Sequence, residues 1–136
     1  MAEAVKKARP EFRNINVAQL VNYRLPWAGK VSILHRASGG ALFLLLPFLL
    51  YLFEQSLTSE ISYAKFSAMM DNVLVKVVVL GLIWSYLHHF CAGIRFLLLD
   101  LHIGLDKVSA QKSAVTVLIV SLLLTAVFGA RLFGLF

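Results

Sequence analysis

The sequence predicts an all-α membrane protein with three transmembrane helices, and three observations support this fold class. Hydrophobic residues make up 60% of the 136 residues, above the roughly 45–50% that is usual for a soluble domain. Charged residues make up only 15%, so a soluble core of this size could not hide the apolar surface and lipid must cover much of it. The apolar residues also gather in three windows, each long enough for the about 20 residues that a spanning helix needs.

The three windows define the predicted spans and the domain organisation. They run from about residue 31 to 53, from about 73 to 99 and from about 114 to 133. Pro47 lies inside the first window and is expected to kink it, which neighbouring helices can tolerate. We therefore divide the chain into an N-terminal tail, residues 1–30, and a three-helix transmembrane anchor domain, residues 31–136.

The distribution of basic residues predicts the orientation in the membrane. The connection between the second and third spans carries Lys107 and Lys112, whereas the first connection has Lys65 among three acidic residues. The N-terminal tail is the most basic segment, with Lys6, Lys7, Arg9, Arg13, Arg24 and Lys30. By the positive-inside rule, the N-terminus is cytoplasmic and the C-terminus periplasmic.

The same composition bounds the location and the class of partner. The tail lacks the apolar stretch of a secretory signal, and Glu3 and Glu11 are unusual for a mitochondrial transit sequence. The expected location is therefore a bacterial inner membrane. The net charge of +6 does not indicate nucleic-acid binding, because the basic residues crowd ahead of an apolar remainder. The single cysteine, Cys91, excludes an internal disulfide and a cysteine-built metal centre.

A polar stripe at the entrance to the first span is the first candidate site. Ser32, His35, Arg36 and Gly39 fall at helical spacing on one face. Arg36 could simply extend to lipid headgroups while His35 lies at the interface. A hydroxyl, an imidazole, a guanidinium and a glycine together instead favour a bound group. Arginine offers a planar fork of donors suited to carboxylates such as haem propionates, serine and arginine could hydrogen-bond a quinone carbonyl, and glycine admits a flat cofactor or a helix.

The second span contains adjacent histidines, His88 and His89. Counting back from Asp100 places His89 about 16 Å inside the span, close to the middle of a core of about 30 Å. A neutral imidazole at that depth is suited to ligate haem iron, although it could also hydrogen-bond a neighbouring helix. His88 is turned about 100° away, so only one of the pair can readily face the same cofactor.

The depths of the histidines bear on the second axial ligand. Counted along the first span, His35 lies about 6 Å inside the membrane, a depth about 10 Å different from that of His89. Two imidazoles on one iron need nitrogens only about 4 Å apart. His35 is therefore expected to hold propionates rather than iron, and the second ligand is expected from another chain. His102 is expected to be a solvated loop residue.

Two motifs resemble a known family. Ser32-Ile-Leu-His-Arg-Ala-Ser-Gly39 resembles the Ser-x-x-His-Arg-x-[Ser/Thr]-Gly signature of the cytochrome b556 subunit of succinate dehydrogenase, respiratory complex II. His89-Phe-Cys-Ala-Gly-Ile-Arg95, followed by Asp100, is similar to that family's His-x-x-x-Gly-x-Arg segment. Phe96 departs from the family, which often has histidine there, and the Ser-Pro-His of many N-terminal tails is absent. The length and the three spans also agree, so the resemblance covers nearly the whole chain.

The resemblance implies a membrane anchor that binds haem b jointly with a second, smaller anchor subunit, the two packing as a helical bundle. His89 matches the axial iron ligand, His35 and Arg36 match propionate-binding positions, and Ser32 and Arg36 match positions lining the ubiquinone site. Trp27 could wall that pocket or anchor the chain at the interface. Flavoprotein and iron–sulfur subunits would dock on the cytoplasmic face and pass electrons from succinate to quinone in the tricarboxylic acid cycle and respiratory chain.

The alternatives are the anchor of a fumarate reductase that uses menaquinone, and a non-redox membrane scaffold. The chain has no flavin or iron–sulfur ligands, so we expect it to contribute a quinone site to an enzyme and to catalyse nothing alone. No catalytic residue is assigned.

Overall fold

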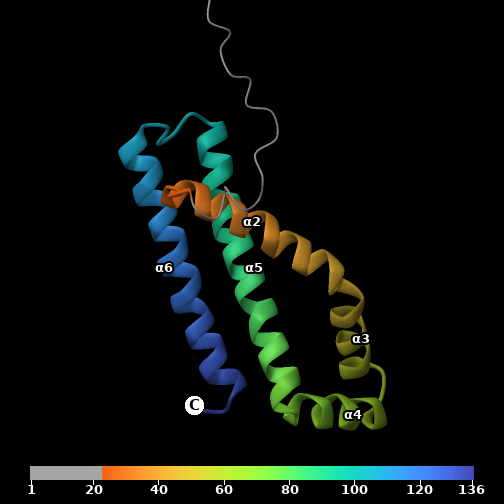
Figure 1. Ribbon diagram of the computed structural model, residues 1–136. Helices are drawn as coiled ribbons and strands as arrows, with labels where there is room; N and C mark the ends of the chain where they lie inside the picture. The colour runs from red at the N-terminus through yellow and green to blue at the C-terminus, as the bar shows by residue number, and fades with distance from the viewer. Residues whose placement is uncertain (1–22) are drawn as a thin grey trace, which may run out of the picture.

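The computed structural model describes residues 23–136, and this part of the chain is helical (Figure 1). Its helices are α2 (Trp27–Leu44), α3 (Leu46–Leu57), α4 (Glu60–Asp71), α5 (Val73–Asp100) and α6 (Lys107–Leu132). The described residues contain no strand, which agrees with the predicted all-α class. Both α5 and α6 are long and apolar enough to cross a membrane, and α2 with α3 makes a third span if the bent pair counts as one.

The first predicted span is broken at Leu45, where α2 and α3 meet at 52°. Pro47, in the first turn of α3, explains the break. Proline has no backbone N–H to donate to the carbonyl four residues earlier, and its ring collides with that carbonyl. The predicted kink is confirmed. Helix α2 also begins at Trp27, so the last residues of the predicted 1–30 tail are helical; residues 1–22 lie outside the described part.

The helices are most closely packed at one end of the bundle, where the loop between α5 and α6 lies (Figure 1). We call this the loop end, and the opposite end, crossed by α4, the α4 end. Helix α2 contacts both α5 and α6, whereas no Cα atom of α3 lies within 8 Å of one in α5. The backbone N–H of Ala28 donates to Gln111 Oε1 at 3.4 Å and ties the start of α2 to α6.

Small residues allow the three helices to approach closely at the loop end. Val31, Ala92, Ala114 and Val117 form one buried cluster contributed by α2, α5 and α6. Side chains of this size suit helix packing in lipid, where van der Waals contact replaces the hydrophobic drive. Many large apolar side chains elsewhere are exposed, including Phe43 and Leu74. These surfaces need lipid or another chain to cover them.

The loop between α5 and α6 is closed by local hydrogen bonds. His102 has a left-handed backbone, with φ of 63°, and the following N–H of Ile103 returns to the carbonyl of Leu98 at 3.0 Å, a pattern that ends helices. His102 is exposed, as expected. Asp106 caps α6 by accepting from the N–H groups of Val108 and Ser109, and the hydrogen bonds with Ser109 hold the pKa of that carboxyl below its usual range.

Arg95 fastens α5 to α6 and is only 6% exposed. Its Nε donates to Ser113 Oγ at 2.9 Å and its Nη2 donates to the carbonyl of Ala110 at 3.1 Å. The sequence indicated this arginine as the end of the second motif. In the structure it also joins two helices, and a buried cation needs such partners.

Replacing Arg95 with alanine should therefore destabilise the chain. Hydrogen bonds from a charged group contribute about 1.5–3 kcal/mol, so we expect the free energy of unfolding in detergent to fall by about 2 kcal/mol. Arg131→Ala provides the control because Arg131 is exposed, and it should change stability by less than about 0.5 kcal/mol. Equal destabilisation by the two substitutions would contradict the role assigned to Arg95.

Candidate functional site

The crossing of α2 and α5 sets the orientation of the His89 imidazole. His89 Nδ1 lies 3.0 Å from the backbone carbonyl oxygen of His35. A carbonyl oxygen can only accept, so this bond places the imidazole proton on Nδ1. Nε2 then keeps its lone pair, which is the state that a metal-binding histidine needs. Histidines that bind metals usually have the other ring nitrogen fixed in this way.

Gly39 provides the space for the His89 ring. A Cβ atom at position 39 would lie 2.7 Å from His89 Cε1 and 3.1 Å from Nδ1, closer than such atoms normally approach. Ser38, one residue earlier, is almost completely buried, and its hydroxyl donates to the His35 carbonyl at 2.9 Å. The sequence identified Gly39 as a position for close approach, and the group that approaches is the imidazole of His89.

The expected difference in depth between His35 and His89 is wrong. The two imidazoles stack with ring centroids 4.1 Å apart and planes 9° apart. Counting residues as depth failed because α2 crosses α5 obliquely and the first span bends at Leu45 (Figure 1). The prediction that His35 is not the second iron ligand can instead be argued from this stacking. Lone pairs of parallel stacked rings lie in separate planes and do not converge on one iron from opposite sides.

His88 faces away from His89, as the 100° helical step predicts. It is completely buried, its Nδ1 lies 3.4 Å from Ser121 Oγ on α6, and its ring stacks on Trp84 at 5.3 Å. Nε2 has no hydrogen-bond partner of normal geometry, although the backbone of Val31 lies near the ring. His88 therefore packs between helices, and its partner Ser121 could not be found from sequence spacing.

Ser32 and Arg36 are brought together on α2. Arg36 Nη2 donates to Ser32 Oγ at 3.2 Å, in an exposed position. The pair leaves the remaining guanidinium N–H groups free of hydrogen bonds within the described part of the chain. Such a fork can donate to a carbonyl or a carboxylate.

Trp27 lies elsewhere on the same helix. Its ring contacts the ammonium group of Lys30, 4.3 Å from the ring centroid, and it lines a groove that includes Lys107 and Gln111 on α6. Five helical residues rotate a side chain by about 140°, so Trp27 and Ser32 lie on different faces of α2. A role for Trp27 as a wall of the quinone pocket remains a prediction.

Two further side chains belong to the site and were not identified from the sequence as site residues. Ser38 lies inside the first motif, and its Oγ is 3.5 Å from His89 Nδ1. Phe96 packs at 5.1 Å against the ring of His35. The motif position of Ser38 was a usable signal. The sequence marked Phe96 only as a departure from the family pattern, and it could not show the contact with His35.

Comparison with known proteins identifies the family of the chain. Residues 9–128 match the family model for the succinate dehydrogenase/fumarate reductase transmembrane subunit. The succinate dehydrogenase cytochrome b556 subunit of Coxiella burnetii is 32% identical over 118 residues, which cover 86% of this chain and 94% of the relative. The corresponding subunit of Paracoccus denitrificans is 29% identical over 84% of each chain, and that of Rickettsia felis is 28% identical over 76% of this chain and 80% of the relative.

The family match covers both motifs and all the helices that form the site. The resemblance noted in the sequence is confirmed by these matches. The chain therefore belongs to the succinate dehydrogenase/fumarate reductase transmembrane-subunit family and is similar over most of its length to cytochrome b556 subunits of succinate dehydrogenase.

Proposed function

We propose that this chain anchors a succinate dehydrogenase in a bacterial inner membrane, ligates haem b through His89 and helps to bind ubiquinone through Ser32 and Arg36. The observation that supports the haem assignment best is the 3.0 Å contact between His89 Nδ1 and the His35 carbonyl. It fixes the proton on Nδ1 and leaves Nε2 as a metal donor.

The residues around His89 fit a haem. The ring lies against Gly39, where a side chain would block it. Bound there, haem b would supply a one-electron carrier inside the membrane. His88 packs against α6 and His102 lies in an exposed loop, so the chain offers no second histidine opposite His89. We assign the second ligand to a small partner anchor subunit.

Arg36 and Ser32 would act on the quinone. As a quinone is reduced, negative charge develops on its carbonyl oxygen, and preorganised donors stabilise that charge. The hydroxyl of Ser32 holds the guanidinium of Arg36, so the cation is positioned before substrate arrives. His35 and Arg36 are also the groups that we assign to the haem propionates, because imidazole and guanidinium N–H groups can donate hydrogen bonds to carboxylates.

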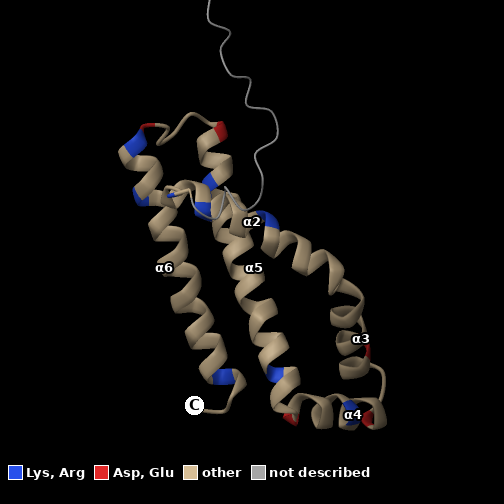
Figure 2. Ribbon diagram, viewed as in Figure 1, with Lys and Arg blue, Asp and Glu red and all other residues tan. Residues whose placement is uncertain are grey.

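The loop end would face the cytoplasm. Arg24, Lys30 and Lys107 line one groove beside the first turn of α6, and Lys112 lies one turn further along that helix, as the positive-inside rule requires of a cytoplasmic surface. Figure 2 shows basic residues at this end. Helix α4 begins at Glu60 and ends at Asp71, and Glu54 lies in the last turn of α3; Figure 2 shows acidic residues together with basic ones at the α4 end. We propose that the iron–sulfur and flavoprotein subunits dock at the loop end and deliver electrons from succinate.

A reduced-minus-oxidised absorption spectrum of the purified complex tests the haem assignment. We expect a b-type band and co-purification of the flavoprotein and iron–sulfur subunits. A complex without that band would refute haem binding and favour a scaffold. Quinone specificity distinguishes a succinate dehydrogenase from a fumarate reductase. A complex that prefers menaquinone and reduces fumarate faster than it oxidises succinate would be a fumarate reductase.

Replacing Arg36 with leucine should separate quinone reduction from succinate oxidation. Loss of a preorganised donor at a developing oxyanion typically costs about 100-fold, so succinate-to-quinone turnover should fall by about that factor. Oxidation of succinate with an artificial dye should persist, because it needs only the extramembrane subunits. Arg131→Leu is the matched control and should leave both activities intact. Equal loss of both activities in Arg36→Leu would indicate failed assembly and contradict the assignment.

A further inference from the structure

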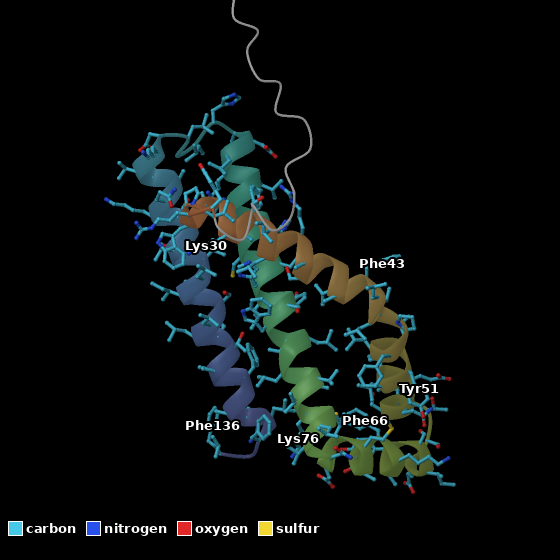
Figure 3. All side chains as sticks on the ribbon, viewed as in Figure 1. Lys30, Phe43, Tyr51, Phe66, Lys76 and Phe136 are labelled. Atoms are coloured by element: carbon cyan, nitrogen blue, oxygen red, sulfur yellow. The ribbon has the colours of Figure 1, made fainter. Side chains whose placement is uncertain are left out.

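A groove at the loop end gathers cations from two helices. It has a volume of about 450 Å³ and is lined by Arg24, Leu25, Pro26, Trp27, Lys30, Lys107 and Gln111. Figure 3 shows Lys30 where the start of α2 passes α6. We call this feature the basic groove. It is separate from the His89 site, none of whose residues line it.

The charged residues that line the basic groove are all positive. Three of its seven lining residues are cationic and none is acidic. The first turns of α2 and α6 also contain no acidic residue, although the N-terminal end of a helix favours anions. Lys107 is the first residue of α6, where its charge opposes the helix dipole. The carboxyl of Asp106 is turned to the N–H groups of its own helix.

The start of α2 is an incomplete cap. Pro26 provides no side-chain hydrogen bond to the helix, and the Ala28 N–H has only a long contact with Gln111. An anion in the groove would accept hydrogen bonds from the N–H groups of this first turn and would neutralise the cations around them.

The lining also points to a ligand with an apolar part. Leu25, Pro26 and Trp27 lie beside the cations, and tryptophan is typical of the membrane–water interface. Gln111 is shared with a second groove of about 460 Å³ along α6, which Lys112, Val115 and Thr116 complete. Further along that helix, Ile119 is 53% exposed. A cationic rim therefore leads onto an apolar helix surface.

We propose that the basic groove binds the phosphate group of an anionic phospholipid, with an acyl chain lying along α6 beside Val115. Basic pockets between transmembrane helices recognise lipid headgroups in this way. The apolar lining and the continuation along α6 favour a lipid over an acidic segment of a soluble protein, which would need cations but no apolar surface beneath them.

Native mass spectrometry of the detergent-solubilised complex, titrated with phosphatidylglycerol or phosphatidylcholine, tests the proposal. Each cation near an anionic headgroup contributes about fivefold in affinity, so Lys30→Gln/Lys107→Gln should weaken phosphatidylglycerol binding about 25-fold. Phosphatidylcholine binding should not change. Lys30→Arg/Lys107→Arg should retain affinity for phosphatidylglycerol. Lys65→Gln/Arg131→Gln removes the same charge from exposed residues at the α4 end and should have no effect.

Several outcomes would overturn the proposal. Equal weakening by the control pair would show general charge attraction rather than a site. Equal affinity of the wild-type complex for the two lipids would show that the groove does not recognise charge. Complete displacement of the lipid by millimolar inorganic phosphate would identify a simple anion site. Unchanged lipid binding with loss of the extramembrane subunits in Lys30→Gln/Lys107→Gln would identify a protein-docking surface instead.

Discussion

Replacing His89 with alanine should abolish the b-type absorbance band of the purified complex. His89 is the histidine whose Nδ1 is held by a backbone carbonyl, at 3.0 Å, so its Nε2 is the imidazole donor available to iron. His88→Gln is the matched neighbour. It can keep a hydrogen bond to Ser121 and should leave the band in place, because position 88 faces α6.

Imidazole added to the His89→Ala complex distinguishes a lost ligand from a lost fold. A small ligand that enters the space of the deleted ring should restore part of the band if the surrounding pocket is intact. A full band in His89→Ala without imidazole would exclude this residue as an axial ligand. Loss of the band in His88→Gln, with the band kept in His89→Ala, would identify His88 rather than His89 as the axial ligand.

Replacing Gly39 with alanine should have the second-largest effect, although the added group is one methyl. The new Cβ would lie 2.7 Å from His89 Cε1, so either the ring moves or α2 and α5 separate. Moving the ring breaks the Nδ1 bond to the His35 carbonyl and the stack with the His35 ring. Overpacking of this kind typically costs about 1–3 kcal/mol. We expect that loss in unfolding free energy, together with a weaker b-type band.

Gly81→Ala is the control for Gly39→Ala. Nothing lies within 4 Å of the position that a Cβ would take at residue 81, and alanine is a better helix former than glycine by about 1 kcal/mol. The Gly81→Ala complex should therefore be at least as stable as the wild type and keep its band. If both substitutions have the same effect, the contact between Gly39 and His89 does not orient the ligand.

The sequence was sufficient to predict the features that depend on local periodicity. The apolar windows predicted α5, α6 and the bent pair α2–α3, but not α4. Pro47 predicted the break near Leu45, and the helical step between His88 and His89 predicted that they face different neighbours. These predictions need only the 3.6-residue period and the missing N–H of proline.

The features that failed depend on how helices cross. The depth of His35 was counted along a straight span normal to the membrane, but α2 is oblique and the stack with His89 results from that angle. The hydrogen-bond partners of Arg95, Ser113 and Ala110, lie on α6, and no local pattern connects them to α5. Crossing angles come from the packing of side chains on both helices, which a single sequence does not determine.

The bend at Leu45 divides the chain into a closely packed part and an arm, α3–α4, and this division suggests an order of assembly. At the loop end, α2, α5 and α6 already bury Val31, Ala92 and Ala114 against one another. Beyond the bend, no Cα atom of α3 lies within 8 Å of one in α5, and α3 packs against α4, which contacts α5. The contacts that orient His89 therefore all come from this chain, whereas the α3–α4 arm exposes apolar side chains such as Phe53 and Ile61 that partner helices or lipid would cover. Ligand orientation would precede subunit docking, and partners would close around a site already formed.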